Sequence, residues 1–118
     1  MLGFLKKILR VKLEELEAKL LPTQQCSFGG AGEIEVKSYS DGSVMLELSL
    51  KHTGIASGQK AEFYCSGELV GSAIVQNGYA KNFIRLEPGA RKPMMTVGST
   101  AEIRVGGTIL YCGTFRPD

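Results

Sequence analysis

The side chains best suited to chemistry in this 118-residue chain are one histidine and three cysteines. The chain offers no second imidazole with which His52 could share a metal ion. The cysteines form no CxxC pair and lie far apart, at Cys26, Cys65 and Cys112. This spacing favours neither a zinc site nor a closed disulfide framework. We therefore predict no metal site, and we interpret His52 as a solvated loop residue.

Other candidate motifs also lack the context that their chemistry needs. The glycine-rich run at residues 29–32 is followed by neither Lys-Ser/Thr nor a helix start, so it does not fit a phosphate-binding loop. No serine lies in a GxSxG motif, and Ser57–Lys60 is an SxxK pair without its usual companion motifs. We predict no catalytic residue, no cofactor and no enzymatic activity.

Charge is distributed unevenly along the chain, whose formal net charge is +2. Residues 1–21 hold five Lys/Arg against three Glu, whereas residues 22–118 hold nine of each sign. Nucleic-acid-binding proteins usually concentrate basic residues on a broad face, so this neutral body argues against that class. The odd number of cysteines and the absence of a signal-peptide pattern favour a cytoplasmic protein.

A leucine stripe at spacings of three and four predicts an amphipathic helix over residues 1–21. Phe4 and Ile8 widen the apolar face over the first turns, and Pro22 ends the helix. The stripe consists of Leu2, Leu5, Leu9, Leu13, Leu16 and Leu20. A face this apolar needs a partner, because burying its side chains is worth on the order of 15–25 kcal/mol before ordering costs.

The rest of the chain reads as a Gly-rich linker over residues 22–32 and a β domain over residues 33–118. Apolar and polar residues alternate there in about seven short segments, joined by turn signals such as Asn77-Gly78. We expect a mainly-β fold, an antiparallel sandwich or a partly open barrel, behind the N-terminal helix. Two similar hairpin units would compose part of it, because Ser57–Val75 aligns with Val97–Phe115.

Two surfaces of the β domain are candidates for contact with a partner. The connection at residues 87–99 is basic and then apolar, through Arg91, Lys92, Met94 and Met95. Such a loop could meet a partner, although a crossover between sheets would need a similar length. The other surface is the outer face of the strands, where we expect aromatic residues to lie under a cover supplied by the helix. These aromatic residues are Tyr39, Tyr64, Tyr79 and Phe83.

These features together predict a non-enzymatic structural or interaction subunit. It would self-assemble as a homo-oligomer through the leucine stripe and present the β domain. One alternative is a peripheral membrane protein whose basic helix meets anionic headgroups, through Lys6, Lys7 and Arg10. Another is an α+β monomer that packs the helix on its own sheet and binds an unknown small-molecule ligand.

Overall fold

The computed structural model of the protein describes residues 11–118, and these residues form eight strands and no helix. No described segment is a helix of the length and apolarity that a membrane crossing requires. The strands are β1 Lys12–Pro22, β2 Ala31–Tyr39, β3 Val44–Lys51, β4 Lys60–Cys65, β5 Glu68–Ile74, β6 Ala80–Leu86, β7 Thr100–Val105 and β8 Thr108–Pro117.

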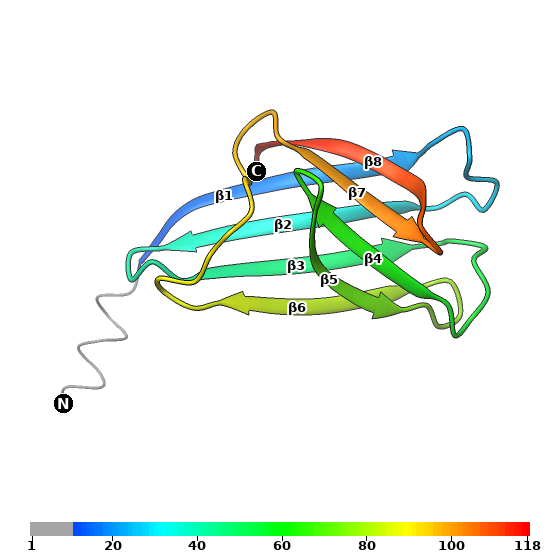
Figure 1. Ribbon diagram of the computed structural model, residues 1–118, viewed down its shortest axis with the longest axis horizontal. Coiled ribbons are helices and arrows are strands. Elements are labelled where there is room, and N and C mark those ends of the chain that lie inside the picture. The colour runs from blue at the N-terminus through cyan, green and yellow to red at the C-terminus, as the bar shows by residue number, and fades with distance from the viewer. Residues whose placement is uncertain (1–10) are drawn as a thin grey trace.

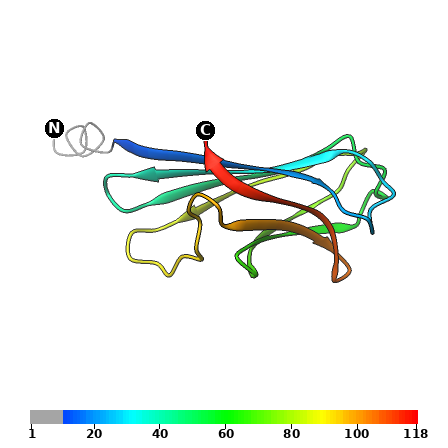
Figure 2. The ribbon, with the colours of Figure 1, turned by 90° about the horizontal axis from the view of Figure 1, so that it is seen from above.

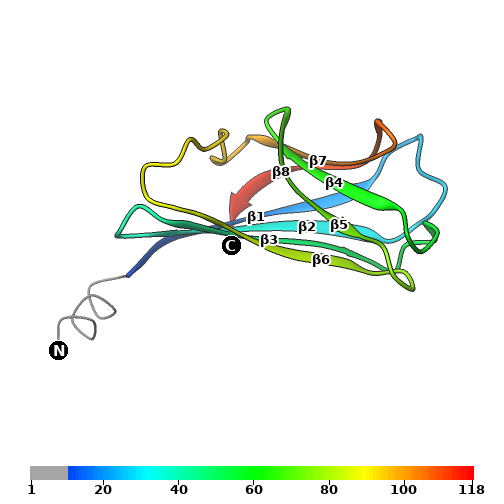
Figure 3. The same ribbon diagram turned by 60° about the horizontal axis from the view of Figure 1, so that its bottom comes forward.

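The strands form one antiparallel sheet that curls into a nearly closed barrel. Its order is β5-β4-β7-β8-β1-β2-β3-β6, so β1 lies near the middle (Figure 1). Two layers result, a long one with β1, β2, β3 and β6 and a short one with β4, β5 and β7 (Figure 3). β8 curves from the short layer into the long one and joins them (Figure 2).

The N-terminal helix predicted from the leucine stripe is wrong over residues 12–21, which belong to β1. Leu16, Ala18 and Leu20 alternate with polar residues and are buried, as expected for a strand with one face in the core. The spacing of four between Leu16 and Leu20 fits one face of a helix, but four is also an even number. The two leucines therefore share a face of the strand as well.

Leu13 lies an odd number of residues from the buried positions, so it points outward and is 69% exposed. Part of the predicted stripe lies outside the described residues, namely Leu2, Phe4, Leu5, Ile8 and Leu9. The predicted linker at residues 22–32 holds the last residue of β1, a turn and the first two residues of β2. The seven strands predicted after residue 32 correspond to β2 through β8.

The two similar hairpins, β4–β5 and β7–β8, share several details at equivalent positions. The Gly58 N–H donates to the Val75 carbonyl at 2.8 Å, and the Gly98 N–H donates to the Phe115 carbonyl at 2.8 Å. β4 and β7 also pair with each other, with Phe63 opposite Ile103. Each hairpin has a register shift, between Phe63 and Tyr64 in one and between Ile103 and Arg104 in the other. The described barrel thus contains a pseudo-twofold relation between these units.

The seam of the barrel lies between the edge strands β5 and β6, which contact each other without ladder hydrogen bonds. Asn82 on β6 bridges it, because its Nδ2 donates to the Ser72 carbonyl of β5 at 2.9 Å. Its Oδ1 accepts a hydrogen bond from the Phe83 N–H at 2.8 Å. One side chain therefore satisfies a backbone group on each edge, and open sheet edges need such protection.

Tyr111 on β8 anchors the loops that cover one end of the barrel. Its hydroxyl donates to the Gly29 carbonyl at 2.6 Å and lies 2.9 Å from the Thr53 Oγ1 atom. The side chain is fully buried, and this burial raises the pKa of Tyr111 to about 12. The Gly54 N–H donates to the Phe28 carbonyl at 2.8 Å beside it. Residues 28–30 and 52–54 are held together at this end of the barrel.

Candidate functional site

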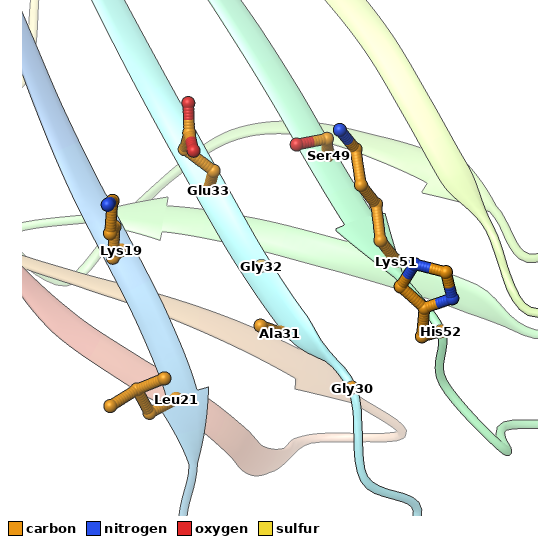
Figure 4. A pocket seen from close by; sticks show the side chains of 9 residues that line it. All are labelled: Lys19, Leu21, Gly30, Ala31, Gly32, Glu33, Ser49, Lys51 and His52. Carbon is orange, nitrogen blue, oxygen red and sulfur yellow. The ribbon is translucent and has the colours of Figure 1, made fainter.

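A hollow of about 310 Å³ opens on the outer face of the long layer, where β1 ends and β2 begins (Figure 4). Side chains from three neighbouring strands and the loop after β3 surround it. In Figure 4, Ala31 lies at the floor, Lys19 and Leu21 on one side, and Lys51 and His52 on the other. The full lining is Lys19, Leu21, Gly30, Ala31, Gly32, Glu33, Ser49, Lys51 and His52.

The hollow exists because the first residues of β2 are small. Ala31 is the cross-strand partner of Lys51 and presents only a methyl group to the outer face. Gly30 has φ +83°, and a Cβ there would lie 2.9 Å from the His52 carbonyl oxygen. A side chain at Gly30 would therefore push β2 away from the end of β3. At Gly32 a Cβ would meet the core side chain of Ile103, so this strand also sits close to the core.

His52 forms one wall of the hollow in a backbone conformation that most residues avoid. Its φ is +57°, in the left-handed region, where histidine is tolerated better than bulkier or branched residues. The Tyr79 hydroxyl lies 3.1 Å from the His52 Nδ1 atom, and the two rings meet edge to face with centroids 5.2 Å apart. The Thr53 N–H donates to the Gly78 carbonyl at 3.1 Å. The imidazole is therefore held in place from the neighbouring turn.

Two ammonium groups line the hollow, one from β1 and one from β3. Lys19 and Lys51 are both exposed, and neither belongs to an ion pair among the described residues. Glu33 is the cross-strand partner of Lys19 and is the acid on this lining, so the two lysines outnumber it. The hollow therefore combines positive charge with the apolar surface of Leu21 and Ala31.

A row of carboxylates crosses the long layer beside the hollow. Glu35 on β2 lies opposite Glu17 on β1 and Glu47 on β3. A hydrogen bond with Glu33, together with burial and the negative charges of Glu33 and Glu47, raises the pKa of Glu35 to about 7. Two groups of three carboxyls bring their oxygens within 4.8 Å of one another, Glu15 with Glu35 and Asp118, and Glu17 with Glu33 and Glu35. Such exposed acidic groups do not by themselves define a metal site.

A second, smaller hollow of about 130 Å³ opens on the same face, over β2, β3 and β6. Phe83 forms one side of it and is 58% exposed. The Lys81 ammonium lies 5.2 Å from the centroid of the Phe83 ring, and its other partner is Glu47 at 2.9 Å. No element among the described residues covers this aromatic ring, so the cover expected from a helix is not supplied by residues 12–21.

A protein-family model matches residues 11–75, which is more than half of the chain. Its description is the aminomethyltransferase beta-barrel domain. The chain belongs to this family. The match runs from β1 through β5, so it contains every residue that lines the larger hollow. No curated protein matches the chain.

The basic connection of this beta-barrel domain is tied to its own hairpin. The Arg91 guanidinium donates two hydrogen bonds to the Glu68 carboxylate, the longer at 2.8 Å, and the Ser66 hydroxyl donates to the Met94 carbonyl at 2.8 Å. Met95 packs against the core, whereas Met94 is 66% exposed and Lys92 is half-buried. These contacts hold the connection after β6 against the β4–β5 hairpin, so it bridges the edge strands β5 and β6 at one end of the seam.

The cysteines of the beta-barrel domain occupy three different environments. Cys65 is fully buried among apolar side chains, and this burial raises the pKa of its thiol to about 12. Cys26 is half-buried and Cys112 is exposed. Cys65 therefore acts as a small apolar core residue, because a thiol with this pKa carries almost no thiolate at neutral pH.

The residues that define the larger hollow were not singled out from the sequence as a site. Lys19 was assigned to a helix, and Lys51 to the start of the long connection over residues 51–60, which the sequence offers as a candidate partner loop beside residues 87–99. The only local signal was the short run of small residues before Glu33, which marks a close backbone approach as readily as a linker. Recognising the hollow requires knowing that the beta-barrel domain places β1 and β3 on either side of β2.

Proposed function

We propose that this beta-barrel is a non-enzymatic interaction module that binds a partner protein through the outer face of β1, β2, β3 and β6. The observation that carries this proposal is that two hollows open on this one face, with the exposed Phe83 ring beside the smaller one. A further hollow of about 520 Å³ lies over the β7–β8 hairpin, and none of the described residues that line it has a large exposed apolar side chain. Protein interfaces favour an aromatic anchor inside a rim of charged groups. Phe83 and its charged neighbours fit that description.

The charge on this face favours a protein over a nucleic acid. Its centre is the row Glu17, Glu35 and Glu47, and a phosphate backbone would be repelled there. Lysines lie at the margins of this row, because Lys81 is 2.9 Å from Glu47 and Lys37 is 3.9 Å from Glu15. A surface of mixed charge beside an exposed aromatic side chain suits a protein partner with complementary charges.

Several features support a binding role over a catalytic one. The Cys65 thiol is buried and its pKa is about 12, so it is poorly suited to act as a nucleophile. The His52 Nδ1 atom is engaged by the Tyr79 hydroxyl. The family description concerns a barrel domain of aminomethyltransferases, and we propose that here the barrel contributes recognition.

The partner is either a second copy of this chain, as self-assembly would require, or a different protein. Self-assembly through a helix is not part of the proposal, because residues 12–21 form β1. The membrane-anchored and α+β alternatives relied on the same helix. A homo-oligomer formed through the outer face of the barrel stays within the proposal.

The test is site-specific photo-crosslinking in the cells that produce the protein. Phe83→p-benzoylphenylalanine puts the reactive group on the proposed face, and Val97→p-benzoylphenylalanine puts it in the connection before β7. Position 97 is the matched control for position 83, because the two native side chains are similarly exposed, at 62% and 58%. We expect a discrete adduct from position 83 alone, and its mass distinguishes a second copy from another protein. The same adducts from both positions, or none from position 83, would overturn the proposal.

A further inference from the structure

The larger hollow has a chemistry that general protein contact does not explain. Lys19 and Lys51 approach it from opposite sides of β2, and each lacks an ionic partner among the described residues. Glu33, the cross-strand partner of Lys19, is the acid on the lining. Two ammonium groups thus face one carboxylate around the same space, which leaves the hollow with an excess of positive charge.

We infer that this hollow binds one oxyanion, a phosphate or a carboxylate, attached to a small apolar or aromatic group. Lys19 and Lys51 would donate charge-assisted hydrogen bonds to the oxyanion. The Ser49 hydroxyl on the lining is a further donor. This inference rests on the proposed function, because the oxyanion would be the chemical group of the partner that binds in the larger hollow.

The remaining lining fits the apolar part of such a ligand. Leu21 and Ala31 supply apolar surface, and the His52 ring stands as a wall beside them. The volume of about 310 Å³ lies at the lower end of small-molecule sites, which span roughly 300–1,000 Å³. The hollow can therefore hold one small group and not an extended chain.

The site is formed before any ligand arrives. Gly30 allows β2 to approach the end of β3 closely, and Tyr79 holds the imidazole of His52. Tyr111 fixes the loop next to Gly30 through its hydrogen bond to the Gly29 carbonyl. A preorganised site loses less entropy on binding, so a weak anionic fragment should give a measurable signal.

Isothermal titration calorimetry on the full chain at low salt tests this inference, with phenyl phosphate and benzoate as probes. Benzyl alcohol carries a similar ring without the charge and should not bind. Lys19→Gln and Lys51→Gln should each weaken binding by about tenfold or more, since a hydrogen bond to a charged group contributes about 1.5–3 kcal/mol. Lys60→Gln removes one charge from the exposed start of β4 and is the matched control.

A second variant separates shape from charge. Ala31→Leu fills the floor of the hollow without altering net charge, and it should abolish binding while the circular dichroism spectrum and thermal unfolding stay unchanged. Tighter binding of phenyl phosphate would identify a phosphorylated group as the source, and tighter binding of benzoate would identify a carboxylate. Either outcome supports the oxyanion site.

The inference fails if neither probe binds, if benzyl alcohol binds as well as the anions, or if Lys60→Gln weakens binding as much as the two hollow variants. This failure is distinguishable from failure of the proposed function. An adduct from position 83 without anion binding would leave the interaction face in place and remove the oxyanion site. Anion binding without a face-specific adduct would remove the partner-protein role.

Discussion

Glu35 shows how neighbouring charges set the behaviour of a single residue on the outer face. Its carboxyl is hydrogen-bonded to that of Glu33, and like-charged side chains face it from both adjacent strands. Lys37 is the nearby group that opposes the shift. The other acidic groups around it are Glu15, Glu17, Glu47 and Asp118. The sequence shows the alternation that places Glu35 outward, but not the register that aligns it with Glu17 and Glu47.

This arrangement predicts a pH dependence of stability. The folded state raises the pKa of Glu35 from 4.5 to about 7, so it holds a proton that the unfolded chain releases between these pH values. The free energy of unfolding therefore falls as pH rises from 4.5 to 7. Glu35→Gln removes the repulsion, and we expect it to stabilise the protein at pH 8 by about 1 kcal/mol, allowing for solvent screening.

Urea denaturation of the two proteins at pH 4 and pH 8 measures the effect. At pH 4 the stabilities should be nearly equal, because the carboxyl is protonated in both the folded and the unfolded state. Glu14→Gln is the control, since Glu14 is exposed and lies opposite Ser38. A gain that is independent of pH, or one that Glu14→Gln reproduces, would contradict this explanation.

At the scale of elements, the sequence predicts the hairpin turns but not the structure of β1. The hairpin turns were predictable because their residues suit the left-handed backbone, as in Asn77-Gly78 with φ of +51° and +84°. β1 has no hairpin partner before it and pairs with β8, from the other end of the chain. The apolar spacing in β1 fits the period of a helix and the period of a strand. Pairing with β8, which is distant in the sequence, therefore decides that this segment is a strand.

The position of β1 predicts the effect of removing it. A chain that begins at Gln24 lacks the strand that pairs with both β2 and β8, and it exposes the core faces of those strands. We expect it to lose cooperative thermal unfolding and the dispersed amide signals of a folded protein. A chain that begins at Val11 keeps all eight strands and is the control. A cooperative transition in the Gln24 chain would show that β1 is dispensable.

At the scale of the whole molecule, the barrel presents two unlike layers. The short layer of β4, β5 and β7 packs against the inner face of the long layer, and its hairpin is strapped by the connection before β7 (Figure 3). The outer face of the long layer is uncovered by described elements and carries both the acidic row and the two hollows. The larger hollow depends on the order β1-β2-β3. Local sequence patterns show the hairpin between β2 and β3, but they do not place β1 beside β2.

Amide chemical-shift mapping by NMR tests the central claim about the larger hollow, that this part of the outer face binds a small oxyanion. Titration of the isotope-labelled chain with phenyl phosphate should shift amides around the larger hollow, at residues 19–21, 30–33 and 49–52. Amides of β4, β5 and β7 should stay in place. Shifts concentrated on the short layer, or none at a probe concentration that saturates a weak site, would contradict the oxyanion site.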